Sequence, residues 1–145
     1  NKVIASLFAA DRLDHLLNET DGLVAKIEAG TTVISDRYYL SSYAYHSVDM
    51  PMEQVIAMNA PSRDLLRPEL HIFVDIDPDT AVARIAANRQ HTELFEKKSR
   101  LAKTRECYMN AIEKLQGEEN IVIIDGTKSI EEIAEEVWMN VKKYF

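Results

Sequence analysis

The chain has 145 residues, of which 46% are hydrophobic and 28% are charged, as in a globular domain with a core rather than a disordered segment. Its 17 Lys and Arg residues against 24 Asp and Glu residues give a net charge of −7, which argues against a dedicated nucleic-acid or anionic-membrane binder. One cysteine and no apolar run of membrane-spanning length predict a cytoplasmic protein without disulfides or membrane anchor.

Three short β-branched runs, each ending on an aspartate, predict buried strands at residues 31–36, 71–75 and 121–125. Helical periodicity predicts helices around them, including residues 2–17, 23–27, 78–88, 94–115 and 130–141. Gly30 can close the second of these helices in a left-handed conformation, and Asp77-Pro78 is a helix start signal. The alternation of strands and helices predicts a single α/β domain over residues 1–145, with a parallel sheet covered on both faces.

Two residues stand where ligands bind in such folds, beyond the carboxyl end of a strand. Asp36 and Arg37 follow the first predicted strand. An acid beside an arginine can serve a metal-bound phosphate and a second anion, because a guanidinium pairs with two phosphate oxygens. A salt-bridged strand end without a catalytic role is the alternative interpretation of this dipeptide.

A second group of candidates lies on the first predicted helix and after Arg37. Phe8 and Arg12 are four residues apart and so share a helix face, where a ring and a cation could hold a nucleobase. A core phenylalanine beside a solvated arginine is the alternative. The following hydroxyl-rich segment suits ribose or base contacts, although its residues are equally common in any helix: Ser41, Ser42, Tyr43 and Tyr45.

Residues 88–116 are the one basic stretch of an acidic chain, and most of their charges are expected to form a solvated helix face. Arg84 and Arg89 differ, because they bracket the predicted end of a helix. A loop that carries Arg89 could close over a transferring phosphoryl group. The four histidines have no metal-ligand spacing, and Cys107 lies within a predicted helix, so a metal site made of protein ligands and a cysteine nucleophile are both disfavoured.

The four glycines are too widely spaced for a Walker-A loop or a dinucleotide-binding loop. The chain nevertheless resembles the thymidylate kinase family through an ordered set of segments that covers nearly its whole length. These are Leu7-Phe-Ala-Ala-Asp-Arg12, Val33-Ile-Ser-Asp-Arg-Tyr38, Ser41-Ser-Tyr-Ala-Tyr45, Arg67-Pro-Glu-Leu-His-Ile-Phe-Val-Asp-Ile-Asp-Pro78 and Ile124-Asp-Gly-Thr127. They resemble about the C-terminal two thirds of a family member.

The resemblance implies transfer of the ATP γ-phosphoryl group to dTMP, giving dTDP for dTTP synthesis, with Mg²⁺ bound to ATP. It also implies a three-layer α/β/α fold of the P-loop nucleoside monophosphate kinase type and a homodimer formed through the helix over residues 2–17. In that helix Val3 and Leu7 could equally face the core.

By motif position, Phe8 would stack on thymine, Arg12 would bind its edge, and Arg37 would hold the acceptor phosphate. Asp36 would contact the magnesium through water, and Arg89 would be a lid arginine in a lid around residues 88–96. The nucleoside pocket would be lined by Tyr38, Ser41, Ser42 and Tyr45, and the adenine side by Arg84, Gly126 and Thr127.

The chain departs from the family at several points. His46 stands where glutamine is common, and Glu93-Leu94 replaces a frequent Asp-Arg of the lid. The strand and glycine-rich phosphate loop that begin family members have no counterpart, so we expect a longer polypeptide and a chain that is inactive by itself. Two alternatives stay open: another nucleoside or nucleoside monophosphate kinase, and a non-catalytic fragment that dimerises or binds nucleotide.

Overall fold

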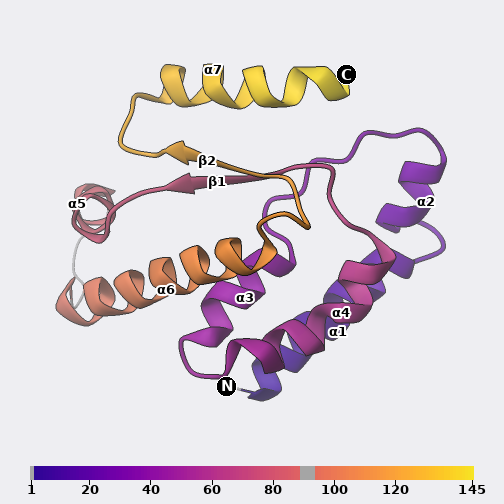
Figure 1. Cartoon of the computed structure of the whole chain (residues 1–145), viewed down its shortest axis with the longest axis horizontal. Coiled ribbons are helices and arrows are strands. Elements are labelled where there is room, and N and C mark those ends of the chain that lie inside the picture. Colours follow the sequence, from indigo (N-terminus) through magenta and orange to yellow (C-terminus); the bar gives the residue numbers. More distant parts are fainter. Residues whose placement is uncertain (1, 89–93) are drawn as a thin grey trace. The chain divides into compact units, whose positions relative to one another are not determined.

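The computed structural model describes residues 2–88 and 94–145, which form two compact units, Asn1–Arg67 and Pro68–Phe145 (Figure 1). We call them the N-terminal and C-terminal units. The described part of the N-terminal unit is helical, with α1 (Lys2–Leu17), α2 (Leu23–Glu28), α3 (Tyr39–Ser47) and α4 (Met52–Leu65). The C-terminal unit contains β1 (His71–Asp75), α5 (Pro78–Asn88), α6 (Leu94–Leu115), β2 (Ile121–Asp125), α7 (Ile130–Val141) and the short 3-10 helix η1 (Lys142–Tyr144). The single domain predicted from the sequence stays a prediction.

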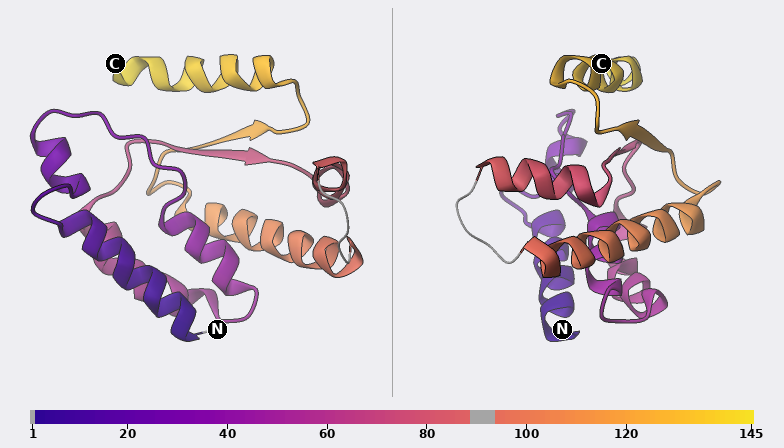
Figure 2. Two further views of the ribbon diagram at one scale, coloured as in Figure 1. Left: turned by 180° about the vertical axis from the view of Figure 1, so that it is seen from behind. Right: turned by 90° about the vertical axis from the view of Figure 1, so that its left-hand side faces the viewer.

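In the N-terminal unit, α1, α3 and α4 pack against one another, as Figure 2 shows from two further sides. Helix α3 has a mainly apolar face because its large residues recur at helical spacing. That face supplies much of the buried core of the unit, and further buried side chains come from α1 and α4: Tyr39, Leu40, Tyr43, Ala44, Ala5, Leu16 and Val55.

One apolar side of α1 does not face this core. Val3, Leu7 and Leu17 are 72%, 64% and 56% exposed, whereas Ala5 and Leu16 of the same helix are buried. Of the two orientations that the sequence allows for Val3 and Leu7, the structure has the outward one. Helix α1 therefore presents an apolar stripe on its exposed side.

The C-terminal unit contains a two-stranded parallel sheet in which His71 is paired with Ile121 and Asp75 with Asp125. Helices α6 and α7 lie on opposite sides of these strands (Figure 1). Parallel strands need a crossover connection, which α5 and α6 provide here. This part of the structure has the predicted order of strand, helices, strand and helix.

The predicted strand over residues 31–36 is wrong: these residues form no strand, and Ile34 is 86% exposed rather than buried. Their β-branched composition favours an extended backbone, but a strand also needs a neighbour that accepts and donates its backbone hydrogen bonds. Within the described residues, the sheet has two strands, β1 and β2. The composition of residues 31–36 therefore favours an extended backbone, but in the structure no neighbouring strand pairs with it.

Local signals at helix ends are confirmed. The Asp77 carboxylate accepts hydrogen bonds from the backbone N–H groups of Asp79 and Thr80 at 3.0 and 2.9 Å, so it caps α5 as the sequence predicts. Gly30 follows α2 with a φ of +85°, the left-handed conformation expected of it. At the start of α7, Ser129 and Glu132 form a capping box that was not predicted from the sequence.

Candidate functional site

Arg12 is held by residues from two other helices. Its Nη2 donates to Ser42 Oγ of α3 at 2.8 Å, and its Nη1 donates to Asn59 Oδ1 of α4. The guanidinium also lies over the Tyr38 ring, 5.7 Å from its centroid. Partial burial removes some of the hydration of the Arg12 guanidinium and so lowers the pKa of Arg12 from its ordinary value. Three of the predicted nucleoside-pocket residues are thus brought together: Arg12, Tyr38 and Ser42.

Phe8 lies one turn before Arg12 on α1. Its side chain is 53% exposed, so it is not the core phenylalanine of the alternative interpretation. The ring centroid is 5.6 Å from that of His46 on α3, with an interplanar angle of 46°. Phe8 therefore presents an accessible aromatic surface on the helix that also carries Arg12.

Asp36 and Arg37 lie in the exposed segment that leads into α3. Arg37 has a φ of +71°, a left-handed conformation that is uncommon for residues with a side chain and costs about 1–3 kcal/mol. Its Nη2 donates to the Tyr45 hydroxyl at 3.3 Å, and its guanidinium lies 4.9 Å from the centroid of that ring. The left-handed turn thus brings the Arg37 guanidinium to Tyr45, another residue of the predicted nucleoside pocket.

Two further residues of the predicted pocket, Tyr38 and Ser41, contribute to the Arg12 cluster through a ring face or lie near it on α3. The Tyr38 hydroxyl donates to the carbonyls of Ser62 and Leu66 at 3.2 and 3.1 Å, so it anchors the end of α4. Its ring, beneath Arg12, is the part that faces the cluster. Ser41 is half-buried near the start of α3.

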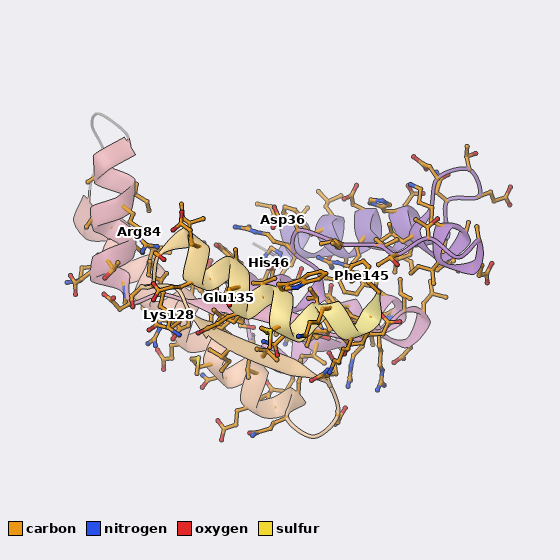
Figure 3. The ribbon with its side chains drawn as sticks, turned by 90° about the horizontal axis from the view of Figure 1, so that it is seen from above. Asp36, His46, Arg84, Lys128, Glu135 and Phe145 are labelled. Atoms are coloured by element: carbon orange, nitrogen blue, oxygen red, sulfur yellow. The ribbon has the colours of Figure 1, made fainter. Side chains whose placement is uncertain are left out.

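The adenine-side residues meet in the C-terminal unit. Arg84 of α5 donates through Nη1 to the Gly126 carbonyl at 2.9 Å, and Figure 3 shows Arg84 beside the loop that leads into α7. Thr127 donates through both its backbone N–H and its hydroxyl to Asp125 Oδ1, and these bonds lower the pKa of that carboxyl. A Cβ on Gly126 would lie 2.7 Å from the Asp75 carbonyl oxygen, so this loop requires glycine.

Arg89 and much of the predicted lid over residues 88–96 lie outside the described residues. Their predicted roles stay predictions. Cys107 is half-buried, and burial raises the pKa of its thiol, as expected of a structural cysteine rather than a nucleophile.

Comparison with known proteins decides the family. The thymidylate kinase family model matches residues 1–137. The chain belongs to the thymidylate kinase family. It is 35% identical over 136 residues to a probable thymidylate kinase of Pyrobaculum calidifontis, covering 93% of this chain and 65% of that protein. It is also 35% identical over 138 residues to a probable thymidylate kinase of Methanocaldococcus jannaschii, covering 94% of this chain and 65% of that protein.

Family membership implies a P-loop nucleoside monophosphate kinase fold, with which the parallel strands and flanking helices of the C-terminal unit agree. The chain spans 65% of the length of these two thymidylate kinase relatives. Among the described residues no helix is long and apolar enough to cross a membrane. The same residues contain no group of three or more His, Cys, Asp or Glu side chains placed to hold a metal ion.

Sequence reasoning missed three polar contacts of this thymidylate kinase family member. Asn59 contacts Arg12, Arg105 forms two hydrogen bonds of 2.7 Å with the Asp75 carboxylate, and the buried His71 imidazole lies 2.7 Å from Glu119. The signal for Asn59 would have been a polar residue at a helical position among apolar ones in residues 52–65, for which no helix bounds were predicted. No local pattern indicates the other two pairs, whose partners are 30 and 48 residues apart.

The stability of the protein should depend on pH through His46. Burial lowers the pKa of His46, and the charge of Arg12 lowers it further. The unfolded chain therefore takes up a proton near pH 6.5, above the folded pKa, so the free energy of unfolding should fall as the pH drops from about 6.5. Urea unfolding between pH 5 and 7.5 measures this slope, and it should be smaller in His46→Gln. An identical slope in the variant would contradict the assignment.

Proposed function

We propose that this protein transfers the γ-phosphoryl group of ATP to dTMP, and that its N-terminal unit carries the dTMP side of the site. The observation that carries the proposal is the Arg12 cluster. Arg12 and Ser42 are 30 residues apart in the sequence, and both belong to segments that resemble the family, yet their side chains are hydrogen-bonded at 2.8 Å. Two segments that resemble the family thus supply polar groups to one cluster, as a binding site requires.

The chemistry of this cluster suits a thymine. A guanidinium has only hydrogen-bond donors, so it pairs with the carbonyl oxygens of thymine and cannot pair with an amino group. Phe8, half-exposed one turn away on α1, provides a ring on which the base can stack. Ser42 and Tyr45 complete the proposed nucleoside pocket, with Ser41 and the Tyr38 ring beside them.

The phosphate end of dTMP is proposed to bind Arg37, which the left-handed turn presents to solvent beside Tyr45. Magnesium keeps several waters and usually binds one or two carboxylates and the substrate phosphates. The exposed Asp36 carboxylate fits that need through water. Bound there, the ion would neutralise charge on the reacting phosphates, while Arg37 orients the acceptor. Positioning and charge neutralisation are most of what phosphoryl transfer requires of a protein.

The C-terminal unit is proposed to contribute the adenine side through Arg84, Gly126 and Thr127, and Arg89 is proposed to act from the lid. The three-layer form of the fold is likewise proposed, since α6 and α7 lie on opposite sides of β1 and β2 (Figure 1). The four glycines are too widely spaced for a Walker-A loop, so no donor-phosphate loop is proposed within these residues. The single cysteine and the substrates fit a cytoplasmic location.

The function is tested by comparing dTMP, dUMP and thymidine side by side, both in calorimetric binding and in turnover with ATP and Mg²⁺. We expect dTMP to bind best. Loss of the methyl group in dUMP should weaken binding by about tenfold. Loss of the phosphate in thymidine should weaken it by about tenfold or more. Equal binding of thymidine and dTMP would overturn the phosphate role of Arg37, and no binding of any of the three would overturn the function.

We also propose a homodimer formed through α1. The exposed apolar stripe of that helix supports it, because an apolar stripe of this kind is typical of a helix that packs against another surface. Leu7→Lys places a charge in the middle of the stripe, and sedimentation velocity should then show a monomer where the unchanged protein is a dimer. Lys2→Glu, a charge change at the exposed start of the helix, is the matched control and should stay dimeric. A monomeric unchanged protein would contradict the proposal.

A further inference from the structure

Asn59 is the most deeply buried polar side chain that contacts the proposed site. It lies on α4, is 1% exposed, and is surrounded by a core in which an amide is costly unless its polar atoms are paired. Its Nδ2 donates to the carbonyl of Val55, one turn earlier on the same helix, at 2.8 Å. Its Oδ1 accepts from Nη1 of Arg12. Both ends of the amide are therefore bonded.

The two partners together determine which way the amide points. The Val55 carbonyl can only accept a hydrogen bond, and the Arg12 guanidinium can only donate one. A flipped amide would oppose donor to donor and acceptor to acceptor. Asn59 must therefore direct its oxygen at Arg12, and the rigid helix backbone at Val55 fixes that oxygen in place.

The guanidinium is consequently held at both ends. Ser42 on α3 accepts from Nη2 and Asn59 on α4 accepts from Nη1, which sets the plane of the Arg12 side chain. These bonds use two of its five N–H donors and leave three for a ligand. A fixed donor array distinguishes bases sharply: thymine offers the O4 acceptor, whereas cytosine has an amino donor at that position. A donor facing a donor in a partly desolvated site is unfavourable.

We propose that Asn59 is a positioning residue for base selection: it holds Arg12 so that the protein binds dTMP in preference to dCMP. Asn59 itself does not touch the nucleotide. This inference rests on the proposed function, because it assumes that Arg12 contacts the base edge. It adds that the selectivity depends on a residue 47 positions away in the sequence.

The test is the ratio of the dissociation constants of dCMP and dTMP, measured by calorimetry on the full chain. Asn59→Ala frees one end of the guanidinium, and we expect the ratio to fall by about tenfold, as for the loss of one charged hydrogen bond. Asn59→Asp keeps an acceptor oxygen toward Arg12 and should retain most of the ratio. Circular dichroism establishes that each variant is folded.

Two controls separate this role from a structural one. Asn140 of α7 donates through Nδ2 to the Glu136 carbonyl at 2.8 Å, the same bond within a helix that Asn59 makes, but in the C-terminal unit. Asn140→Ala should leave the ratio unchanged. In an Arg12→Ala background, Asn59→Ala should have no further effect on the ratio, because Asn59 acts through Arg12.

A folded Asn59→Ala that keeps the full ratio would overturn the proposal, and so would a folded Asn59→Asp that loses it. A fall in the ratio for Asn140→Ala, or a further fall in the double variant, would overturn it as well. A different result bears on the proposed function alone: if the unchanged protein does not prefer dTMP to dCMP, the base-reading role of Arg12 fails before Asn59 is considered.

Discussion

Arg37→Ala is expected to lower kcat/KM for dTMP phosphorylation by about 10³-fold or more, the usual cost of removing a cation or donor that stabilises the transferring group. The affinity for dTMP should fall by about 10 to 100-fold, because a charged hydrogen bond to the phosphate is lost. The guanidinium is exposed and contacts Tyr45, so the free energy of unfolding should change little. A coupled ATP assay, calorimetry and urea unfolding measure the three quantities.

Two further variants isolate the side chain from the strained turn. Arg37→Gly removes the strain of the left-handed backbone and should raise the free energy of unfolding by about 1 kcal/mol. Its kcat/KM should nevertheless be as low as that of Arg37→Ala, because both variants lack the guanidinium. Arg67→Ala removes an exposed arginine outside the proposed site and should retain near-normal kinetics. Near-normal kcat/KM in Arg37→Ala would contradict the role proposed for Arg37.

Tyr39→Ala should have the largest effect on stability. The Tyr39 side chain is fully buried, with its ring centroid 4.6 Å from that of Tyr38 and 5.5 Å from that of Tyr43. Truncation leaves a cavity and removes aromatic contacts, so the free energy of unfolding should fall by about 3–5 kcal/mol. Urea unfolding followed by circular dichroism measures the change.

The matched control for this prediction is Tyr39→Phe, which keeps the ring and its packing. Tyr39→Phe should lower the free energy of unfolding by less than about 1.5 kcal/mol, the contribution of one hydroxyl hydrogen bond. A Tyr39→Ala protein as stable as Tyr39→Phe would show that the ring packing at the start of α3 contributes little to the fold.

Short-range signals in the sequence predicted several helix ends correctly. The cap at Asp77 and the left-handed Gly30 depend on neighbours within a few positions, and both are confirmed. The strand predicted over residues 31–36 failed for the opposite reason. A strand is completed by a neighbouring strand, and neither composition nor β-branching supplies that partner.

The proposed site was predictable only in part. Family motifs indicated Arg12 and Ser42 separately, and the structure shows that they are hydrogen-bonded. Asn59 carries no motif, and its role becomes visible only when α4 is packed against α1. The left-handed conformation of Arg37 was equally unforeseen, because that conformation favours glycine or asparagine and an arginine gives no signal for it.

The sequence by itself determined what depends on neighbouring residues and on motif order: the Asp77 cap, the left-handed Gly30, the two strands that form, and membership of the thymidylate kinase family. It also excluded a phosphate loop within these residues, because four widely spaced glycines cannot form one. Only the tertiary structure decided which side of α1 is exposed and which groups hold Arg12. Those contacts join residues 30 and 47 positions apart, and the path of the chain between them is set by packing of the whole unit rather than by any local pattern.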